Sequence, residues 1–195
     1  MTKKLSEMSL EELWELFPIR LQDYNPEYKI WYQEEKEQIT STVGPEDIKR
    51  ISHIGSTAVE GLVAKPIVDI LLEVDSNCDI KELKSKLISA GWILMSCDEN
   101  PELNLSFNKG YTPEGFAERA FHLHVRNWGD PDELYFRDYL RSNRKVAAKY
   151  GELKQKLKDK YKHNRDGYTE AKFEFINKWT QKARKKFGNR YLPVE

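Results

Sequence analysis

Cysteine is scarce in this sequence of 195 residues, and it contains no apolar run long enough to cross a membrane. Two cysteines, Cys78 and Cys97, cannot form a disulfide framework in a chain of this length. Charged residues make up 33% of the chain and interrupt its apolar stretches, which argues against a transmembrane span. Behind Lys3 and Lys4 there is no apolar segment that could serve as a signal sequence. We therefore expect a cytoplasmic protein without a membrane partner.

Net charge is absent as well. The chain has 32 basic and 32 acidic residues, so its overall balance gives no reason to expect a nucleic-acid partner. The balance hides an asymmetry: residues 1–129 contain 14 basic and 22 acidic side chains, a net of −8, whereas residues 130–195 contain 18 and 10, a net of +8. An RNA partner is therefore still compatible with the sequence, provided that the basic part binds it and presents it to the acidic part.

A single domain is expected at this length, and we divide it into three segments. Residues 1–45 are predicted to form N-terminal helices and a leading strand, 46–128 the sheet core, and 129–195 a basic helical part. A capping box of Ser9 and Glu12 begins the first helix. Asn25 and Pro26 begin a second helix, which is predicted to extend to about Thr40.

The segment from Ile48 to Arg126 is dominated by an apolar period of two residues, which is typical of strands. One helix interrupts this pattern from about Asp79 to Ala90, and Gly91 ends it. The predicted strands are Ile48–Ile54, Ile67–Val74, Trp92–Phe107 with a break near Asn100-Pro101, and Phe121–Arg126.

Beyond Asp130 the sequence predicts helices to the C-terminus, with breaks at Gly151 and Gly167 and a stop at Gly188. The lysines from Lys154 to Lys162 are predicted to form a solvated face, and this face is the predicted RNA contact. Its candidate residues are Lys154, Lys156 and Lys158. The apolar stripes predicted to pack into the core are Val146, Tyr150, Leu153, Leu157 and Tyr161, and then Phe173, Ile176, Trp179, Ala183 and Phe187.

The predicted strand Ile67–Val74 contains carboxylates. Side chains alternate between the two faces of a strand, so Asp69 and Glu73 share one face and the apolar even-numbered residues share the other. An unpaired buried carboxylate is costly, so Asp69 is expected to be paired, to bind a metal or to face a cleft. A purely structural ion pair with a lysine is the alternative.

Two further motifs carry groups that suit phosphate and metal chemistry. In the first, a predicted strand runs into Gly55-Ser56-Thr57, where backbone amides and hydroxyls can hold a phosphate, although such a sequence is commonly only a turn. In the second, His122 and His124 share one face of a strand. They can share a metal, or one can contact phosphate while the other transfers protons; a solvated polar face is the alternative.

Four segments of the sequence resemble the GrpB family, a little-characterised group with a nucleotidyltransferase-like fold. They are HIGSTAVEGLVAKPIVDILLEV from His53, FHLHVRNWGD from Phe121, FRDYLRSNRKVAAKYGELKQKL from Phe136 and YTEAKFEF from Tyr168. The resemblance extends from about Ile19 to about Trp179. It implies an α+β fold in which a mixed sheet has helices on one face, with further C-terminal helices.

The chemistry that this resemblance implies is nucleotidyl transfer, in which a hydroxyl attacks the α-phosphate of a nucleoside triphosphate and pyrophosphate leaves. Carboxylates on one strand would hold Mg²⁺ or Mn²⁺, and the resemblance assigns this role to Asp69 with Glu73. The nucleotide-binding residues that it implies are Gly55, Ser56, Thr57, Lys65 and Arg126.

The sequence departs from the superfamily pattern where the second carboxylate is usual, two residues after the first. Leu71 stands at that position. Glu73 lies on the correct face, but it is four residues from Asp69, or about 13 Å at a strand rise of about 3.3 Å per residue. The second ligand therefore comes either from Glu73 across this gap or from another strand, where His122 or His124 could supply it. A histidine ligand moves the preference from magnesium towards manganese, zinc or iron.

Three functional hypotheses follow. The first is a nucleotidyltransferase that acts on an acceptor hydroxyl, such as the 3′ end of a tRNA or other RNA, with Asp69, His122 and His124 as catalytic residues. The second is a nucleotide-binding protein that has lost catalysis because Leu71 replaces a carboxylate. The third is a metal-dependent hydrolase that uses the same aspartate and two histidines.

Overall fold

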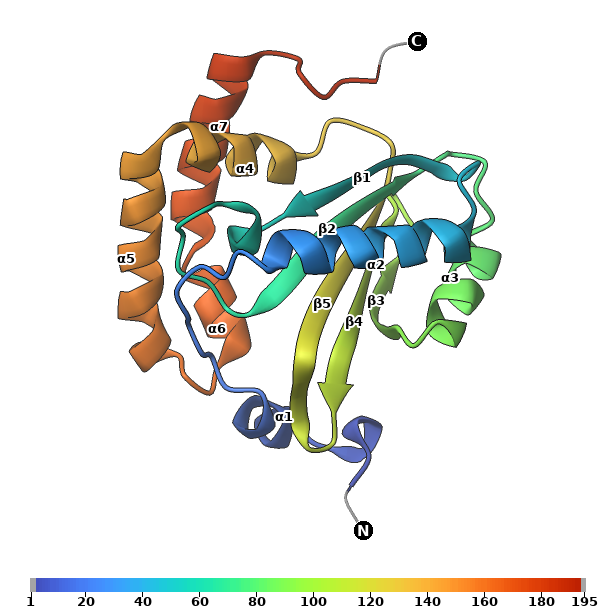
Figure 1. The fold of residues 1–195 in the computed structure, drawn as a ribbon, viewed down its shortest axis with the longest axis horizontal. Coiled ribbons are helices and arrows are strands. Elements are labelled where there is room, and N and C mark those ends of the chain that lie inside the picture. Colours follow the sequence, from blue (N-terminus) through green and yellow to red (C-terminus); the bar gives the residue numbers. More distant parts are fainter. Residues whose placement is uncertain (1–2, 194–195) are drawn as a thin grey trace.

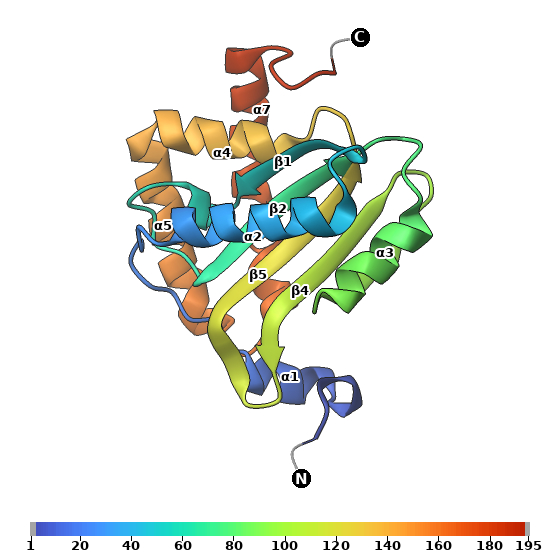
Figure 2. The same ribbon diagram turned by 45° about the vertical axis from the view of Figure 1, so that its right-hand side comes forward.

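A five-stranded mixed sheet forms the centre of the computed structural model, which describes residues 3–193 (Figures 1 and 2). The strands lie in the order β1-β2-β5-β4-β3. Their bounds are Ile48–Ile54 (β1), Ile67–Val74 (β2), Ile93–Asp98 (β3), Asn104–Thr112 (β4) and Gly115–Asn127 (β5). Only β2 and β5 pair in parallel among these strands, and the other three pairings are antiparallel. The α+β class with a mixed sheet is therefore confirmed.

Two helices cover one face of the sheet, which we call the apolar face. They are α2 (Tyr28–Val43) and α3 (Ile80–Ser89), and Figures 1 and 2 show α2 crossing the strands on this side. The even-numbered residues of β2 lie beneath them, together with alternate residues of β4 and β5. All of these side chains are apolar, so burying this face contributes most of the hydrophobic free energy of folding.

The C-terminal helices gather at the other face, at the β1 end of the sheet (Figure 1). They are α4 (Asp132–Ser142), α5 (Arg144–Lys160), α6 (Arg165–Glu170) and α7 (Phe173–Phe187). A separate apolar cluster joins α4, α5 and α7 to the segment after β1, with Leu62, Leu140 and Tyr150 among its buried members. The basic part of the chain therefore packs against the acidic part as a second wall.

The first of the N-terminal helices starts as its sequence predicts, whereas the second begins two residues later than predicted. A short 3₁₀ turn, η1 (Leu5–Glu7), precedes α1 (Leu10–Leu16), and the Ser9 and Glu12 capping box is present. Asn25 accepts a hydrogen bond from the backbone of Glu27, and α2 begins at Tyr28. Asp79 caps α3 through two backbone amides.

Several predicted boundaries are wrong. The break predicted near Asn100-Pro101 is present, but it separates two antiparallel strands, β3 and β4, and β4 continues beyond Phe107 to Thr112. Gly151 and Gly167 lie within α5 and α6, whereas the real starts of these helices are capped by Asn143 and Asn164. A Cβ atom at Gly151 would lie 3.3 Å from Val63 Cγ1 and 3.6 Å from Leu62 Cδ1, so the small size of glycine serves packing here.

The two C-terminal stripes are only partly core. Val146, Tyr150 and Ala183 are buried as predicted, but Phe173 is 66% exposed, because the first turn of α7 extends beyond the cluster. The predicted solvated lysine face is interrupted as well, since Lys154 is buried. No helix among the described residues is both long and apolar enough to cross a membrane.

Candidate functional site

A cavity of about 1060 Å³ lies between the C-terminal helices and the face of the sheet opposite α2 and α3, which we call the site face. Its floor consists of β2 and β5, which contribute Asp69, His122, His124 and Arg126. The opposite wall is built from α5, the α6 region and α7. The alternation of side chains along the sequence had assigned each of these four residues to the polar face of its strand.

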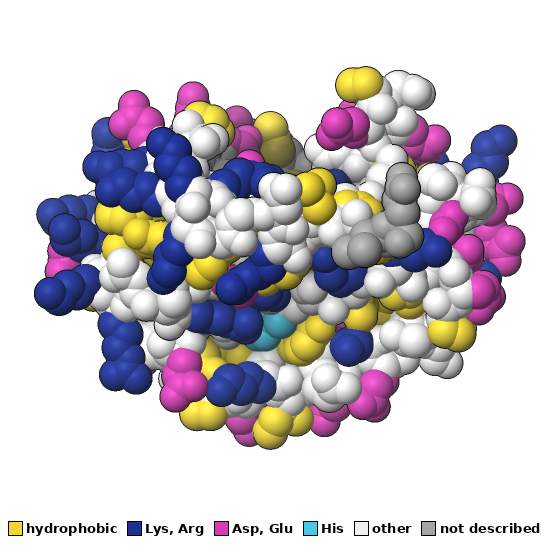
Figure 3. Space-filling view, turned by 90° about the horizontal axis from the view of Figure 1, so that it is seen from above, with side chains coloured by type: hydrophobic (Ala, Val, Ile, Leu, Met, Phe, Trp, Pro, Cys, Tyr) yellow, Lys and Arg dark blue, Asp and Glu magenta, His cyan; other side chains and the backbone are white. Residues whose placement is uncertain are grey.

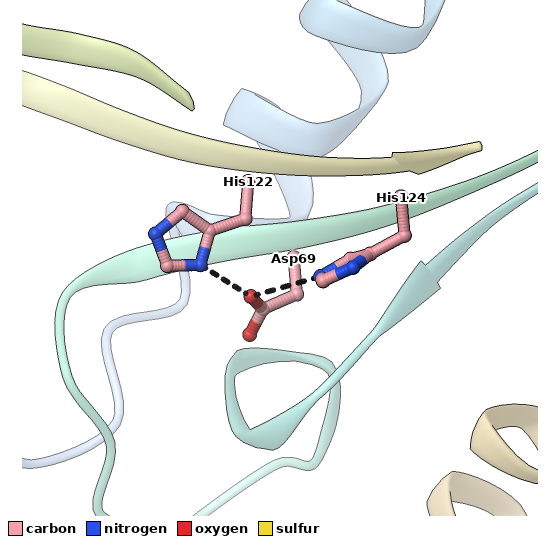
Figure 4. A group of neighbouring side chains, drawn as sticks. All are labelled: Asp69, His122 and His124. Carbon is pink, nitrogen blue, oxygen red and sulfur yellow. Dashed lines mark hydrogen bonds and ion pairs between the residues drawn. The ribbon is translucent and has the colours of Figure 1, made fainter. Parts of the chain in front are cut away.

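Asp69, His122 and His124 form the centre of the cavity (Figure 4). Asp69 and His122 are direct neighbours in the parallel β2-β5 register, and His124 lies two residues further on the same face. The Asp69 Oδ1 atom is 3.0 Å from His122 Nδ1 and 3.9 Å from His124 Nε2. One potential ligand atom from each residue lies within 4.8 Å of the others. The structure thus brings together the aspartate and the two histidines that the sequence singled out.

Burial and the contacts among these groups set their protonation. Burial opposes ionisation of Asp69, but its hydrogen bond with His122 and the nearby imidazole of His124 together outweigh burial and keep the pKa of Asp69 below its usual value. Burial lowers the pKa of His122 to about 4; the charges of Arg165 and Lys65 lower it further, while Asp69 opposes the shift. At neutral pH the carboxylate is therefore ionised and the His122 imidazole is neutral.

Gly55 allows the chain to approach Asp69. Its φ of 70° lies in the left-handed region, and a Cβ atom at this position would overlap the carboxylate of Asp69. The following residues form a short 3₁₀ turn, η2 (Ser56–Ala58). The predicted glycine turn is therefore adjacent to the predicted aspartate, because antiparallel pairing places Ile54 opposite Asp69.

Lys154 reaches this turn from α5. It is only 3% exposed, and its ammonium group donates hydrogen bonds to Ser56 Oγ at 2.8 Å and to the carbonyl of Val63. The prediction that Lys154 lies on a solvated face and contacts RNA there is wrong. On the same helix Lys156 is exposed and Lys158 is half-buried, so these two candidates remain at the surface.

Four cations crowd the end of the cavity around Asp69. They are Lys65, Lys154, Arg165 and Lys172, and we call them the cation cluster. Burial lowers the pKa of Lys65 and of Lys154 to about 7, and that of Lys172 to about 8; neighbouring cations add to each shift, and Asp69 opposes it. None of the four forms an ion pair with a carboxylate of residues 3–193 in the structure. Positive charge at this end is therefore uncompensated except by Asp69.

Sequence reasoning missed Arg165, Lys172 and Tyr168, which line the same part of the cavity. Tyr168 is fully buried between Lys65 and Lys172, whose ammonium groups lie 5.8 and 4.4 Å from its ring centre. In the sequence, Arg165 and Lys172 are two of many basic residues in the C-terminal part. The matching segment YTEAKFEF contains Tyr168 and Lys172, and it was the one available signal.

Thr57 and Arg126 have other surroundings than expected. Thr57 is 1% exposed, and its hydroxyl is hydrogen-bonded to His53 Nε2 and the Ile67 carbonyl, so it supports the turn. Arg126 lines the cavity four residues beyond His122, where it donates to the carbonyls of Leu105 and Val125. It therefore lies away from the cation cluster.

Glu73 does not join the metal-binding group. It is fully buried, and both of its oxygens accept from Arg50, at 2.5 and 2.7 Å. The backbone amide of Gly129 donates a third hydrogen bond. The expectation that Glu73 serves as the second metal ligand is therefore wrong, because antiparallel pairing places Arg50 directly opposite it.

A sequence model of the family described as GrpB protein matches residues 18–182. This match covers most of the chain. The protein belongs to the GrpB family. The resemblance on which the sequence analysis relied is thereby confirmed.

Relatives in several bacteria support this membership. The glutamate-rich protein GrpB of Alkalihalophilus pseudofirmus is 32% identical over 158 residues, which cover 79% of this chain and 89% of that protein. The protein YqkA of Bacillus subtilis is 30% identical over 190 residues, covering 94% of this chain but only 53% of YqkA. The chain thus spans about half the length of YqkA. The crystal structure of GrpB from Enterococcus faecalis superimposes with a TM-score of 0.75 and 28% identity, covering 86% of this chain and 99% of that one.

Proposed function

We propose that this GrpB protein binds a nucleoside triphosphate in the cavity and catalyses metal-dependent nucleotidyl transfer. The observation that carries this proposal is the cation cluster directly beside Asp69, His122 and His124. Unpaired cations that are buried or half-buried are costly, so a site that collects one buried and three half-buried cations favours a ligand of high negative charge. A triphosphate supplies that charge.

The donor set fits a divalent metal. Asp69 would provide an oxygen ligand and the two histidines nitrogen ligands, from an arrangement in which one atom of each already lies within 4.8 Å of the others. Two imidazoles favour Mn²⁺ over Mg²⁺, because Mg²⁺ prefers oxygen ligands. When bound, such an ion polarises a phosphoryl oxygen and lowers the pKa of an attacking hydroxyl.

The phosphates would lie between Ser56 and the cation cluster. Ser56 and Lys154 are already joined by a hydrogen bond, so one phosphate oxygen can accept from both at little cost in side-chain ordering. Lys65 and Lys172, whose ammonium groups both lie near the Tyr168 ring, would neutralise the remaining charge. The backbone of Gly55 approaches the carboxylate of Asp69 closely, so the turn that would hold the phosphates lies beside the proposed metal ligand.

The test is turnover of each labelled triphosphate with Mg²⁺ or Mn²⁺, with and without tRNA that lacks its terminal nucleotides. Transfer requires pyrophosphate release together with incorporation of label. Lys154→Met should weaken triphosphate binding by about tenfold or more, since it removes a charged hydrogen-bond donor. Lys156→Met, two residues away and exposed, is the matched control and should bind like the wild type.

A metal-dependent hydrolase is the second candidate, and the combination of one carboxylate and two histidines favours it. Release of inorganic phosphate or of the nucleotide without incorporation into any acceptor would support this candidate and contradict transfer. Triphosphate binding that survives in Asp69→Ala, without any turnover in the wild type, would instead support a binding protein that has lost catalysis.

An RNA acceptor is the partner we propose for the surface of α5. Lysine and arginine side chains gather on this side of the molecule, at the left of Figure 3, and a histidine side chain is visible between cations nearer the centre of the view. Lys156 and Lys158 belong to α5. If they contact phosphates, the double substitution to Glu should weaken RNA binding and reduce its salt dependence. Unchanged affinity would contradict an RNA contact at α5.

A further inference from the structure

Arg165 lies beside the metal-binding group and has no carboxylate partner among residues 3–193. It begins α6 and is half-buried in the wall of the cavity. One of its terminal nitrogens is 2.8 Å from His122 Nε2 and 2.7 Å from the Tyr111 hydroxyl. The same hydroxyl is 2.7 Å from His122 Nε2. Arg165 and Tyr111 thus both contact the Nε2 side of the His122 ring, opposite the side that faces Asp69.

This contact determines which nitrogen of His122 carries the proton. A guanidinium nitrogen can only donate, so the His122 Nε2 atom that faces it must offer a lone pair. The neutral ring has one proton, which then lies on Nδ1 and is donated to Asp69 Oδ1, 3.0 Å away. Arg165 and the Asp69 carboxylate therefore favour the same tautomer of His122 from opposite sides of the ring.

That tautomer conflicts with metal binding. Nδ1 is the His122 atom that faces Asp69, and a proton there removes the lone pair that a metal ion needs. The ring can become a ligand without changing its charge if its proton moves to Nε2 and is donated to Tyr111. For this to happen, Arg165 must leave Nε2, because two donors cannot face each other at 2.8 Å.

We propose that Arg165 is a positioning residue that couples anion binding to metal binding: an anion in the cavity attracts the guanidinium, and its departure from His122 completes the metal site. The inference rests on the proposed anion site of the cavity, and it adds a mechanism by which an anion binds first and a metal ion second. Arg165 is suited to this because its planar guanidinium can bind a tetrahedral oxyanion through two parallel hydrogen bonds.

Coupling of this kind is reciprocal, so it can be measured from the metal side. The probes are Zn²⁺, which binds imidazole well, and sulfate, a dianion that chelates zinc weakly. In calorimetric titrations of the wild type, sulfate should increase the zinc affinity about tenfold, within the usual range of coupling between two sites. Arg165→Met should bind zinc more tightly without sulfate, and sulfate should then have little effect.

Removing any cation near the site would favour zinc electrostatically, so a matched control is needed. Arg126→Met removes one charge from the same cavity, at a side chain that contacts neither His122 nor the cation cluster. It should retain the sulfate effect on zinc affinity. Equal zinc affinities and equal sulfate effects in Arg165→Met and Arg126→Met would overturn the inference. Thermal unfolding of both variants shows whether they are folded, and Arg165→Lys, which keeps the charge, provides a second test if the methionine variant is not.

A spectroscopic readout addresses the tautomer directly. Nitrogen-15 chemical shifts of the His122 ring should place the proton on Nδ1 in the metal-free wild type, where it is donated to Asp69, and on Nε2 in zinc-bound Arg165→Met, where the metal takes the Nδ1 lone pair. A proton on Nε2 in the wild type would overturn the inference while leaving the metal site intact. Zinc affinity that does not change with sulfate would overturn the coupling alone, whereas absence of zinc binding in every condition would overturn the metal site of the proposed function as well.

Discussion

The two faces of the central sheet are made by the same strands but differ in chemistry. Beneath α2 and α3, the even-numbered residues of β2 are apolar and fully buried. On the site face, β2 presents Asp69 and Glu73, and β5 presents two histidines and an arginine. The apolar face stabilises the sheet by removing hydrocarbon from water, so the site face can hold groups that cost free energy to bury.

The site face is itself divided, as its two carboxylates show. Glu73 is enclosed and bonded to Arg50 on the neighbouring strand, which is a structural ion pair. Asp69 keeps a side-chain exposure of 27% and faces histidines and uncompensated cations. Two carboxylates on one face of one strand therefore differ in role because their neighbours differ.

The largest effect is expected from the apolar face. Phe107→Ala removes a fully buried ring beneath α2 and α3 and should lower the free energy of unfolding by about 4 kcal/mol. Urea denaturation measures this loss. Zinc binding of the folded fraction should be unchanged, because the ring points away from the cavity. Loss of zinc binding in folded Phe107→Ala would break the distinction between the faces.

Glu73 should behave as a structural residue. Arg50→Met leaves its carboxylate buried without a cation and should lower the free energy of unfolding by about 3 kcal/mol. The matched control is Lys29→Met, which removes the exposed pair between Lys29 and Glu60 and should change stability by at most about 0.5 kcal/mol. Similar losses in the two variants would contradict a buried structural pair.

Gly55 should affect both stability and the site. Gly55→Ala forces a side chain into a left-handed conformation and against Asp69, so we expect a loss of about 2 kcal/mol and clearly weaker zinc binding. Gly91→Ala meets the same kind of backbone penalty, with a φ of 88°, but has no atom within 4 Å. It should cost about 1 kcal/mol and leave zinc binding intact. Zinc binding that is equally strong in both variants would argue that Asp69 is not a ligand.

The smallest effects concern pH and the cation cluster. The pKa values of Lys65 and Lys154 are lowered to about 7 and that of Lys172 to about 8, whereas the same lysines in the unfolded chain have pKa values near 10.5. Between these values the unfolded state binds more protons, so stability should rise with pH from about 7 towards 10. Anion affinity should fall over the same range, because the lysines lose their charge. Calorimetric titration with sulfate at pH 6.5 and pH 9 checks the second trend, and equal affinities would contradict it.

Local sequence patterns predicted much of the fold. The bounds of β1 and β2 agree with the predicted ranges, and the caps at Ser9 and Asp79 are present. These features depend on neighbours within a few residues, through side-chain alternation and backbone amides. Predictions that used glycine as a helix breaker failed at Gly151, because packing against Leu62 and Val63 outweighs the intrinsic helix propensity.

The alternation of side chains along the strands also predicted that the candidate site lies on one face of the sheet. Asp69 and Glu73 were assigned to the same side from alternation alone, and so were His122 and His124. Register decided the rest: parallel pairing set Asp69 beside His122, and antiparallel pairing set Arg50 beside Glu73. Such pairings join residues that are 23 to 53 positions apart, and no local pattern specifies them.

By itself, then, the sequence determined most of the secondary structure elements, the polar sides of β2 and β5, and the family. Only the tertiary structure decided that the basic C-terminal part turns Lys154, Arg165 and Lys172 inward to face Asp69. The physical reason is that the sequence of a helix does not specify whether a charged side chain faces solvent or another part of the protein. A lysine becomes a solvated surface group or a buried cation according to which distant element packs against its helix.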